Sequence, residues 1–178
     1  MFQRLFGRER HANRAITEAL YGQIVAAARQ TPLYADWNVP DTPLGRFEVL
    51  SLAMFLLQDR LRGEKGASAE VAQMLIDEFF TDVEHSLREL GIGDLGVPKR
   101  MKKLAKMFYG RTVAYAEALE NGDRAGLAAA LARNVRPDEP GWPEAERLAA
   151  YAFQVREALA AQPSQDICAG RLSFPTAA

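Results

Sequence analysis

The segment that most constrains the fold is the apolar run over residues 49–57, VLSLAMFLL. In a helix spanning about residues 43–62, this run is apolar nearly all round, so other helices must contact it on several sides. The run is about half as long as a helix that crosses a bilayer, which favours a water-soluble protein. Thr42 and Pro43 are typical of a helix start, because threonine caps the first amides and proline suits the first turn. The segment therefore predicts the central helix of a bundle.

The rest of the chain repeats helical periodicity and lacks the apolar–polar alternation that is typical of strands. Amphipathic patterns predict further helices over about residues 12–29, 68–90, 98–120, 123–134 and 143–162. We therefore expect an all-α, compact, single-domain bundle of about six helices over residues 12–162. Residues 1–11 are expected to form a basic amphipathic N-terminal arm, and residues 163–178 an irregular, extended C-terminal tail.

Composition indicates where in the cell the protein works, but it identifies no partner. The net charge is −1, so no overall field attracts nucleic acid or an anionic membrane. Cys168 is the only cysteine, so the chain forms no internal disulfide and fits a reducing compartment. The N-terminus lacks the long apolar stretch and cleavage site of a secretory signal. These features predict a cytoplasmic protein.

The side chains that catalysis requires are not combined in a recognisable pattern. Asp82 and His85 form a single carboxylate–histidine pair, whereas a di-iron bundle needs two such pairs and further carboxylates. Cys168 has no histidine near it in the sequence. The glycine-rich residues 91–96 lack the lysine and the preceding strand of nucleotide-binding loops. The sequence therefore predicts a binding protein without a metal or cofactor, and not an enzyme.

Two segments have charge patterns beyond ordinary helix packing. On the predicted helix 98–120, the side opposite the core carries Lys99, Lys102, Lys103 and Lys106, and the same segment also contains the cations Arg100 and Arg111. It is either a plain solvated face, a partner site, or a surface for RNA or the ribosome. In the N-terminal arm, Phe2, Leu5 and Phe6 alternate with arginines. This pattern indicates weak membrane contact or, equally, a disordered terminus.

A set of short strings carries a more specific signal than packing requires. The strings are residues 39–42 (VPDT), 45–47 (GRF), 91–94 (GIGD), 97–103 (VPKRMKK) and 108–111 (FYGR), supported by Tyr21, residues 24–29, Asp82, residues 87–89 and Asn134. In order and spacing, the chain resembles the ubiquinol–cytochrome c chaperone family. Leu52-Ala53 stands where the family pattern has Leu-His, so no role of that histidine is carried over.

The resemblance implies an all-helical assembly factor of the cytochrome bc1 complex that binds newly made cytochrome b. It also implies a small partner protein, contact with the ribosome, and a peripheral position at the inner membrane, on the matrix side in mitochondria. No DNA partner is expected. Two other hypotheses remain open: an RNA- or ribosome-associated adaptor, and a helical carrier of a quinone or lipid, which requires an internal cavity.

Candidate partner-binding residues lie in the proline-rich loop and along the helix that follows the glycine-rich turn. They are Tyr34, Trp37, Asp41, Arg46, Lys99, Arg100, Lys102, Lys103, Lys106, Tyr109 and Arg111. For Asp41 and Arg46, a local cap and salt bridge is an equally good interpretation. Gly110 equally favours a close approach between two helices.

Overall fold

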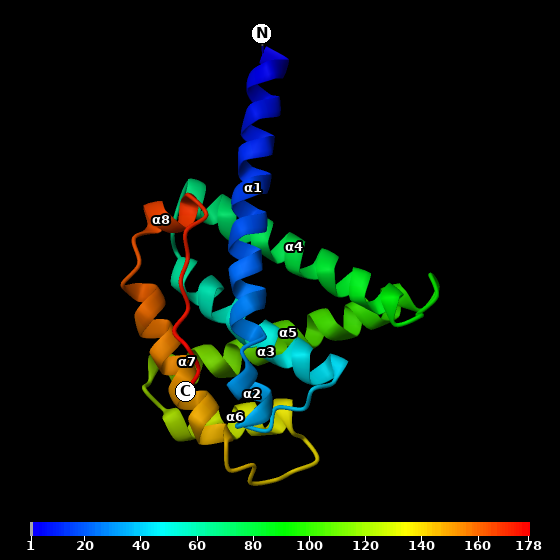
Figure 1. The fold of residues 1–178 in the computed structure, drawn as a ribbon, viewed down its shortest axis with the longest axis vertical. Coiled ribbons are helices and arrows are strands. Elements are labelled where there is room, and N and C mark those ends of the chain that lie inside the picture. Colours follow the sequence, from blue (N-terminus) through cyan, green and yellow to red (C-terminus); the bar gives the residue numbers. More distant parts are fainter. Residues whose placement is uncertain (1) are drawn as a thin grey trace.

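The structure is a computed structural model that describes the backbone of residues 2–178 and the side chains of residues 13–178. Over the described residues it contains eight helices and no strand (Figure 1). The helices are α1 (Phe2–Ala28), α2 (Thr31–Ala35), α3 (Pro43–Leu61), α4 (Ala67–Glu89), α5 (Val97–Glu120), α6 (Arg124–Val135), α7 (Ala145–Ala160) and α8 (Ser164–Cys168). The all-α prediction is confirmed, and the two five-residue helices α2 and α8 are additional to the six predicted ones.

Helix α3 lies at the centre of the bundle, as its apolar run predicts. It contacts α1, α4, α5, α6 and α7, and Met54 and Leu57 in its middle are fully buried. The predicted start is also confirmed, because the backbone amide of Gly45 donates to the Thr42 hydroxyl over 3.1 Å. Pro43 occupies the first turn, where its missing amide hydrogen costs nothing.

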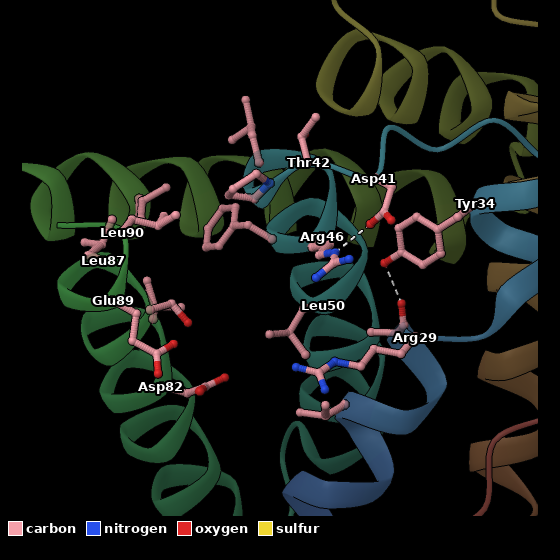
Figure 2. Close-up of a pocket in the computed structure, with 18 residues that line it drawn as sticks. Arg29, Tyr34, Asp41, Thr42, Arg46, Leu50, Asp82, Leu87, Glu89 and Leu90 are labelled. Carbon is pink, nitrogen blue, oxygen red and sulfur yellow. Dashed lines mark hydrogen bonds and ion pairs between the residues drawn. The ribbon is translucent and has the colours of Figure 1, made fainter. Parts of the chain in front are cut away.

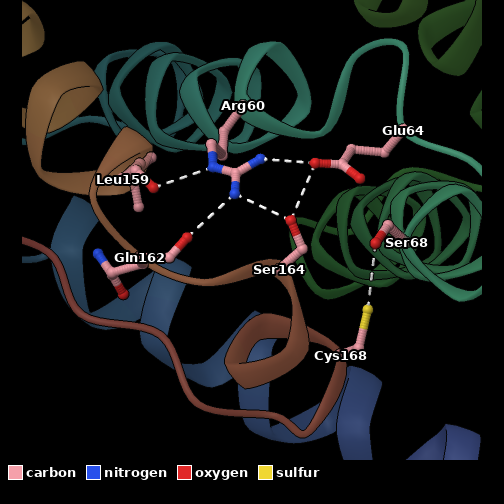
Figure 3. Close-up of polar contacts among 7 residues, drawn as sticks. All are labelled: Arg60, Glu64, Ser68, Leu159, Gln162, Ser164 and Cys168. Atoms are coloured by element: carbon pink, nitrogen blue, oxygen red, sulfur yellow. Dashed lines mark hydrogen bonds and ion pairs between the residues drawn. The ribbon is translucent and has the colours of Figure 1, made fainter.

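Residues 171–178 are irregular, as predicted, but residues 164–168 form the short helix α8, and the C-terminal segment packs against the bundle. Ile167 of α8 is fully buried, and the guanidinium of Arg60 in α3 anchors the segment before it (Figure 3). Arg60 Nε donates to the Leu159 carbonyl over 3.1 Å, and Nη2 donates to the Gln162 carbonyl over 3.0 Å and to Ser164 Oγ over 2.9 Å. The tail has no helical period of its own, so its order comes from contacts with distant segments.

The N-terminal arm is not separate from the first helix. Helix α1 already begins at Phe2, because no proline interrupts residues 2–12, and its N-terminal half projects beyond the other helices (Figure 1). The side chains of Phe2, Leu5 and Phe6, which were expected to contact a membrane, lie outside the described residues. Within the part of the chain that was searched, every helix is too short or too polar to cross a membrane.

Helices α4 and α5 form a hairpin whose turn lies away from the other helices (Figure 1). Aromatic rings attach this hairpin to the N-terminal end of α3. Phe79 of α4 is fully buried, and its ring centroid lies 6.0 Å from that of Phe47 and 5.1 Å from that of Phe108. The aromatic cluster therefore sets the spacing between α3 and α4.

Candidate functional site

A groove of about 640 Å³ opens between the C-terminal end of α1, the N-terminal end of α3 and the C-terminal half of α4 (Figure 2). Most of its lining is apolar: Val25, Ala28, Leu44, Phe47, Leu50, Val83, Leu87, Leu90 and Leu104. Leu44 and Leu90 are 48% and 57% exposed, so the groove offers apolar side chains that the rest of the chain does not cover. The groove is large enough for several apolar side chains of a bound molecule.

The rim of the groove carries opposite charges on its two sides. Arg29 and Arg46 point their guanidinium groups in from α1 and α3, whereas Asp82 and Glu89 belong to α4 (Figure 2). Within the described residues, Arg29 makes no side-chain hydrogen bond or ion pair. Arg46 Nε lies 2.6 Å from Asp41 Oδ1, and this hydrogen bond holds the pKa of the Asp41 carboxyl below its usual value. A ligand that carries both positive and negative groups therefore meets an oppositely charged side chain on each side of the groove.

Asp82 is held in place by a tyrosine of α1. The Tyr21 hydroxyl donates to Asp82 Oδ2 over 2.8 Å. Burial and this hydrogen bond together raise the pKa of Tyr21 well above its ordinary value, so the tyrosine stays a donor. His85, the other half of the carboxylate–histidine pair, instead contacts Glu89 on the exposed side of α4. The two residues of that pair therefore have different partners.

The proline-rich loop takes its shape from two contacts next to the groove. The Tyr34 hydroxyl donates to the Ala28 carbonyl over 2.7 Å and so satisfies the C-terminal end of α1. Gly45 lies so close to the loop that a β-carbon there would stand 2.0 Å from the carbonyl oxygen of Pro40. This contact explains why a glycine follows the VPDT string at a fixed spacing.

Replacing Gly45 with alanine is expected to lower the free energy of unfolding by about 1–3 kcal/mol, because the new methyl group forces Pro40 to move. The measurement is denaturant unfolding followed by circular dichroism. Gly110→Ala is the matched control, since a β-carbon at Gly110 meets nothing within 4 Å. That variant is expected to be neutral or slightly stabilised. Equal destabilisation of both variants would contradict the argument.

The structure brings only part of the predicted loop site together. Tyr34, Asp41 and Arg46 line the groove, as a partner site requires. Trp37 does not, because only 2% of its surface is exposed and its ring packs edge-on against Tyr151 at 5.6 Å. The expectation that Trp37 offers a partner surface is therefore corrected: α2 turns the loop inward and makes this residue part of the core.

The predicted cationic side of α5 is accessible to solvent. Lys99, Arg100, Lys102, Lys103 and Lys106 are all exposed, and none forms an ion pair with another described residue. Tyr109 is 52% exposed beside them. A close helix approach at Gly110 is not observed in the described part of the chain, because the space above its Cα is open. Partner binding by these residues stays a prediction.

Arg111 belongs to the interior, which corrects its assignment as a partner-binding residue. Its Nη2 lies 2.8 Å from Glu48 Oε1, and the two side chains are 14% and 1% exposed. Burial raises the pKa of the Glu48 carboxyl to about 7, against the opposing effect of the Arg111 charge. Close by, Asn134 Nδ2 donates to the Tyr115 hydroxyl over 2.8 Å. Arg111 and Asn134, which both belong to the strings that carry the family resemblance, thus make polar contacts inside the bundle.

Several groove residues are missed by sequence reasoning. Periodicity places Leu90 in the core stripe of its helix, whereas the structure exposes it at the end of α4. Arg29 and Leu44 carry no pattern that marks them as surface-site residues. The sequence offers one indication: Leu44 and Leu90 lie at the ends of predicted helices, where fewer neighbouring residues cover a side chain. Glu48 does not line the groove, but its position directly before the apolar run of a central helix already indicated that it would be buried.

Two comparisons with known proteins, one with family models and one with solved structures, agree with each other. The family model described as ubiquinol-cytochrome C chaperone matches residues 35–174. A crystal structure of the Cbp3 homolog from Brucella abortus is 54% identical in sequence and superposes with a TM-score of 0.91. That match covers 99% of this chain and 98% of the other. No curated protein matches the chain at a significant level.

Proposed function

Because the chain belongs to the ubiquinol-cytochrome C chaperone family, we propose that it is an assembly factor of the cytochrome bc1 complex. Its client is newly made cytochrome b, which it holds until haem insertion and assembly. The observation that carries this proposal is the open groove between α1, α3 and α4, with its exposed leucines. Holding a client requires such a surface and no reaction chemistry, so we do not expect the protein to be an enzyme.

The groove suits a segment of a membrane protein that has not yet met its final partners. Such a segment exposes apolar side chains to water, and covering them is favourable by about 25 cal/mol per Å². Leu50 on α3 and Leu90 at the end of α4 line the groove from two different helices (Figure 2), and Leu44 in the first turn of α3 also lines it. A groove that opens to solvent admits part of a long chain and also lets that part leave.

The charged rim supports binding at a boundary between apolar and polar residues. Arg29 and Arg46 on one side and Glu89 on the other offer partners for the polar residues that flank a transmembrane segment. We therefore propose that the client segment includes such a flank. The protein then works at the inner face of the membrane that holds the bc1 complex, together with a small partner protein or the ribosome where these are present.

A carrier of an enclosed quinone or lipid has less support. Beneath α3 and α7, a pocket lined by Val49, Leu56 and Tyr151 has a volume of about 10 Å³. Such a volume holds about one water molecule. The space for a large apolar ligand is the surface groove, which suits a chain segment better than a ligand that must be sealed from water.

The experiment that tests the proposal is capture of cytochrome b by the tagged chain from detergent extracts. The double variant Leu44→Asp/Leu90→Asp is expected to capture at least about tenfold less cytochrome b, because two exposed leucines lose their burial and two charges enter the groove. Both leucines are partly exposed, so the variant is expected to fold. In a strain without the chain, assembled bc1 complex is expected to fall while transcripts stay constant.

Ala125→Asp/Ala129→Asp is the charge-matched control, since both alanines are exposed on α6 and lie outside the groove. It is expected to capture cytochrome b as well as the unchanged chain does. If the unchanged chain retains no cytochrome b, or if both variants behave alike, the groove does not hold this client.

A further inference from the structure

The cationic residues of α5 differ from other charged groups near them because they have no partner in the described part of the chain. Arg88 pairs with Glu84 and Asp94, and Arg111 pairs with Glu48. The acidic groups near the hairpin turn thus contact Arg88 or His85 and not the cations of α5. Five cations remain free: Lys99, Arg100, Lys102, Lys103 and Lys106.

The lysines share one side of the helix with exposed apolar residues. At about 100° per residue, Lys99, Lys102, Lys103 and Lys106 fall within an arc of about 100°. Val113 projects from the same side about two turns beyond Lys106, and it is 69% exposed. Tyr109, at the border of this arc, is 52% exposed. We call this set of lysines with Tyr109 and Val113 the α5 outer face.

The hairpin turn adds a fully exposed leucine at the end of the α5 outer face. Leu95 lies just before α5 and is 99% exposed, on a turn that stands away from the other helices (Figure 1). A leucine in this position has no packing role in the monomer. Free cations next to exposed apolar side chains are the combination that interfacial helices present to anionic membranes.

We propose that the α5 outer face and Leu95 bind the surface of a bilayer that contains anionic phospholipids. The lysine ammonium groups contact the headgroups, and their long apolar stems lie along the surface. Leu95 enters the acyl boundary at one end of the face, and Val113 and Tyr109 rest on the interface at the other. The helix axis of α5 therefore lies roughly parallel to the membrane.

Charge complementarity favours a membrane over other partners for this face. The whole chain has a net charge of −1 in spite of these five cations, so the remainder is net negative and is repelled by an anionic bilayer. An RNA partner accounts for the lysines and for Tyr109 but not for Leu95 or Val113, because RNA-binding faces use aromatic stacking platforms and not aliphatic side chains. This inference stands independently of the client bound in the groove.

The test is sedimentation of the purified full chain with vesicles. Vesicles of phosphatidylcholine mixed with an equal share of phosphatidylglycerol are expected to bind the chain, and pure phosphatidylcholine vesicles are not. Binding is expected to weaken as salt rises. Each lysine near such a surface contributes about fivefold in affinity, so Lys102→Glu/Lys103→Glu/Lys106→Glu is expected to lose at least about 100-fold.

Two further variants separate the contributions. Lys103→Glu and Lys65→Glu change the net charge equally, but Lys65 lies in the loop between α3 and α4, so only the first is expected to weaken binding by fivefold or more. Leu95→Ser is expected to reduce affinity about fivefold with all lysines present, which an RNA or a purely electrostatic contact does not explain.

Three outcomes overturn the proposal. They are equal binding to neutral vesicles, unchanged vesicle binding by the triple lysine variant, and absence of vesicle binding together with lysine-dependent binding of ribosomal RNA. The second outcome would assign membrane contact to the N-terminal end of α1 instead. Because Leu44→Asp/Leu90→Asp is expected to bind vesicles normally, failure here is distinguishable from failure of client binding.

Discussion

Replacing Arg111 with methionine is expected to lower the free energy of unfolding by about 1–2 kcal/mol at pH 8, because it removes the partner of a buried carboxylate, which then takes up a proton. Glu48 is 1% exposed at its side chain, and the guanidinium of Arg111 is the cation that lies against it, 2.8 Å away. Removing that cation leaves the Glu48 carboxyl between α3 and α5 without an oppositely charged partner. The measurement is denaturant unfolding at pH 5 and pH 8.

The effect of the Arg111 substitution is expected to depend on pH in a defined direction. Burial raises the pKa of Glu48 from 4.5 to about 7, so the folded protein holds this proton more tightly than the unfolded chain does. The stabilisation from Glu48 is therefore present in full below about pH 4.5 and is lost as pH rises through about 7. At pH 5 the carboxyl is neutral, and Arg111→Met is expected to cost much less than at pH 8.

Two controls make the Arg111 prediction specific. In Glu48→Gln the side chain stays neutral, so the fall in stability between pH 5 and pH 8 that this carboxyl causes, about 3 kcal/mol at most, is expected to disappear. In the double variant Glu48→Met/Arg111→Met, most of the loss at pH 8 is expected to be recovered, because no buried charge remains. A loss of stability in Arg111→Met that is equal at both pH values would show that packing, and not charge, is responsible.

Replacing Arg60 with methionine is expected to destabilise the protein by about 3 kcal/mol and to loosen its C-terminal segment. The guanidinium donates to the carbonyls of Leu159 and Gln162 and to the hydroxyl of Ser164 (Figure 3). Hydrogen bonds from a charged donor contribute about 1.5–3 kcal/mol each, and their losses here are partly offset because the exposed end of α7 gains water. The measurement is denaturant unfolding together with hydrogen exchange of the amides in residues 164–172.

Arg14→Met is the matched control for Arg60. Arg14 forms its ion pair with Glu18 on the surface, where both side chains are more than half exposed. Its removal is expected to leave the unfolding midpoint and the exchange of residues 164–172 almost unchanged. If Arg60→Met behaves like this control, the C-terminal segment is anchored by other contacts, such as the buried Ile167 and the hydrogen bond from Leu172 N to Gln23 Oε1.

Sequence reasoning located one wall of the candidate site and missed the other. Tyr34, Asp41 and Arg46 were selected because they surround a recognisable helix start, and the structure places all three at the groove. The opposite wall belongs to α4. The periodicity of that helix assigns Asp82 to its solvated face and Leu90 to its core stripe, so neither was selected as a site residue. Periodicity gives the direction of a side chain around its own helix, but not what lies opposite it. A groove shared by three helices is therefore invisible until those helices are placed.

The features that the sequence alone determined are those that neighbouring residues control. Thr42 and Pro43 start α3, and the apolar run after them requires burial on all sides, so an all-helical bundle follows from local physics. Tertiary structure alone decided the rest, because each of the remaining features joins residues far apart in the chain. It paired Arg111 with Glu48, buried Trp37, ordered the C-terminal segment around Arg60, and left Leu90 beside an open groove.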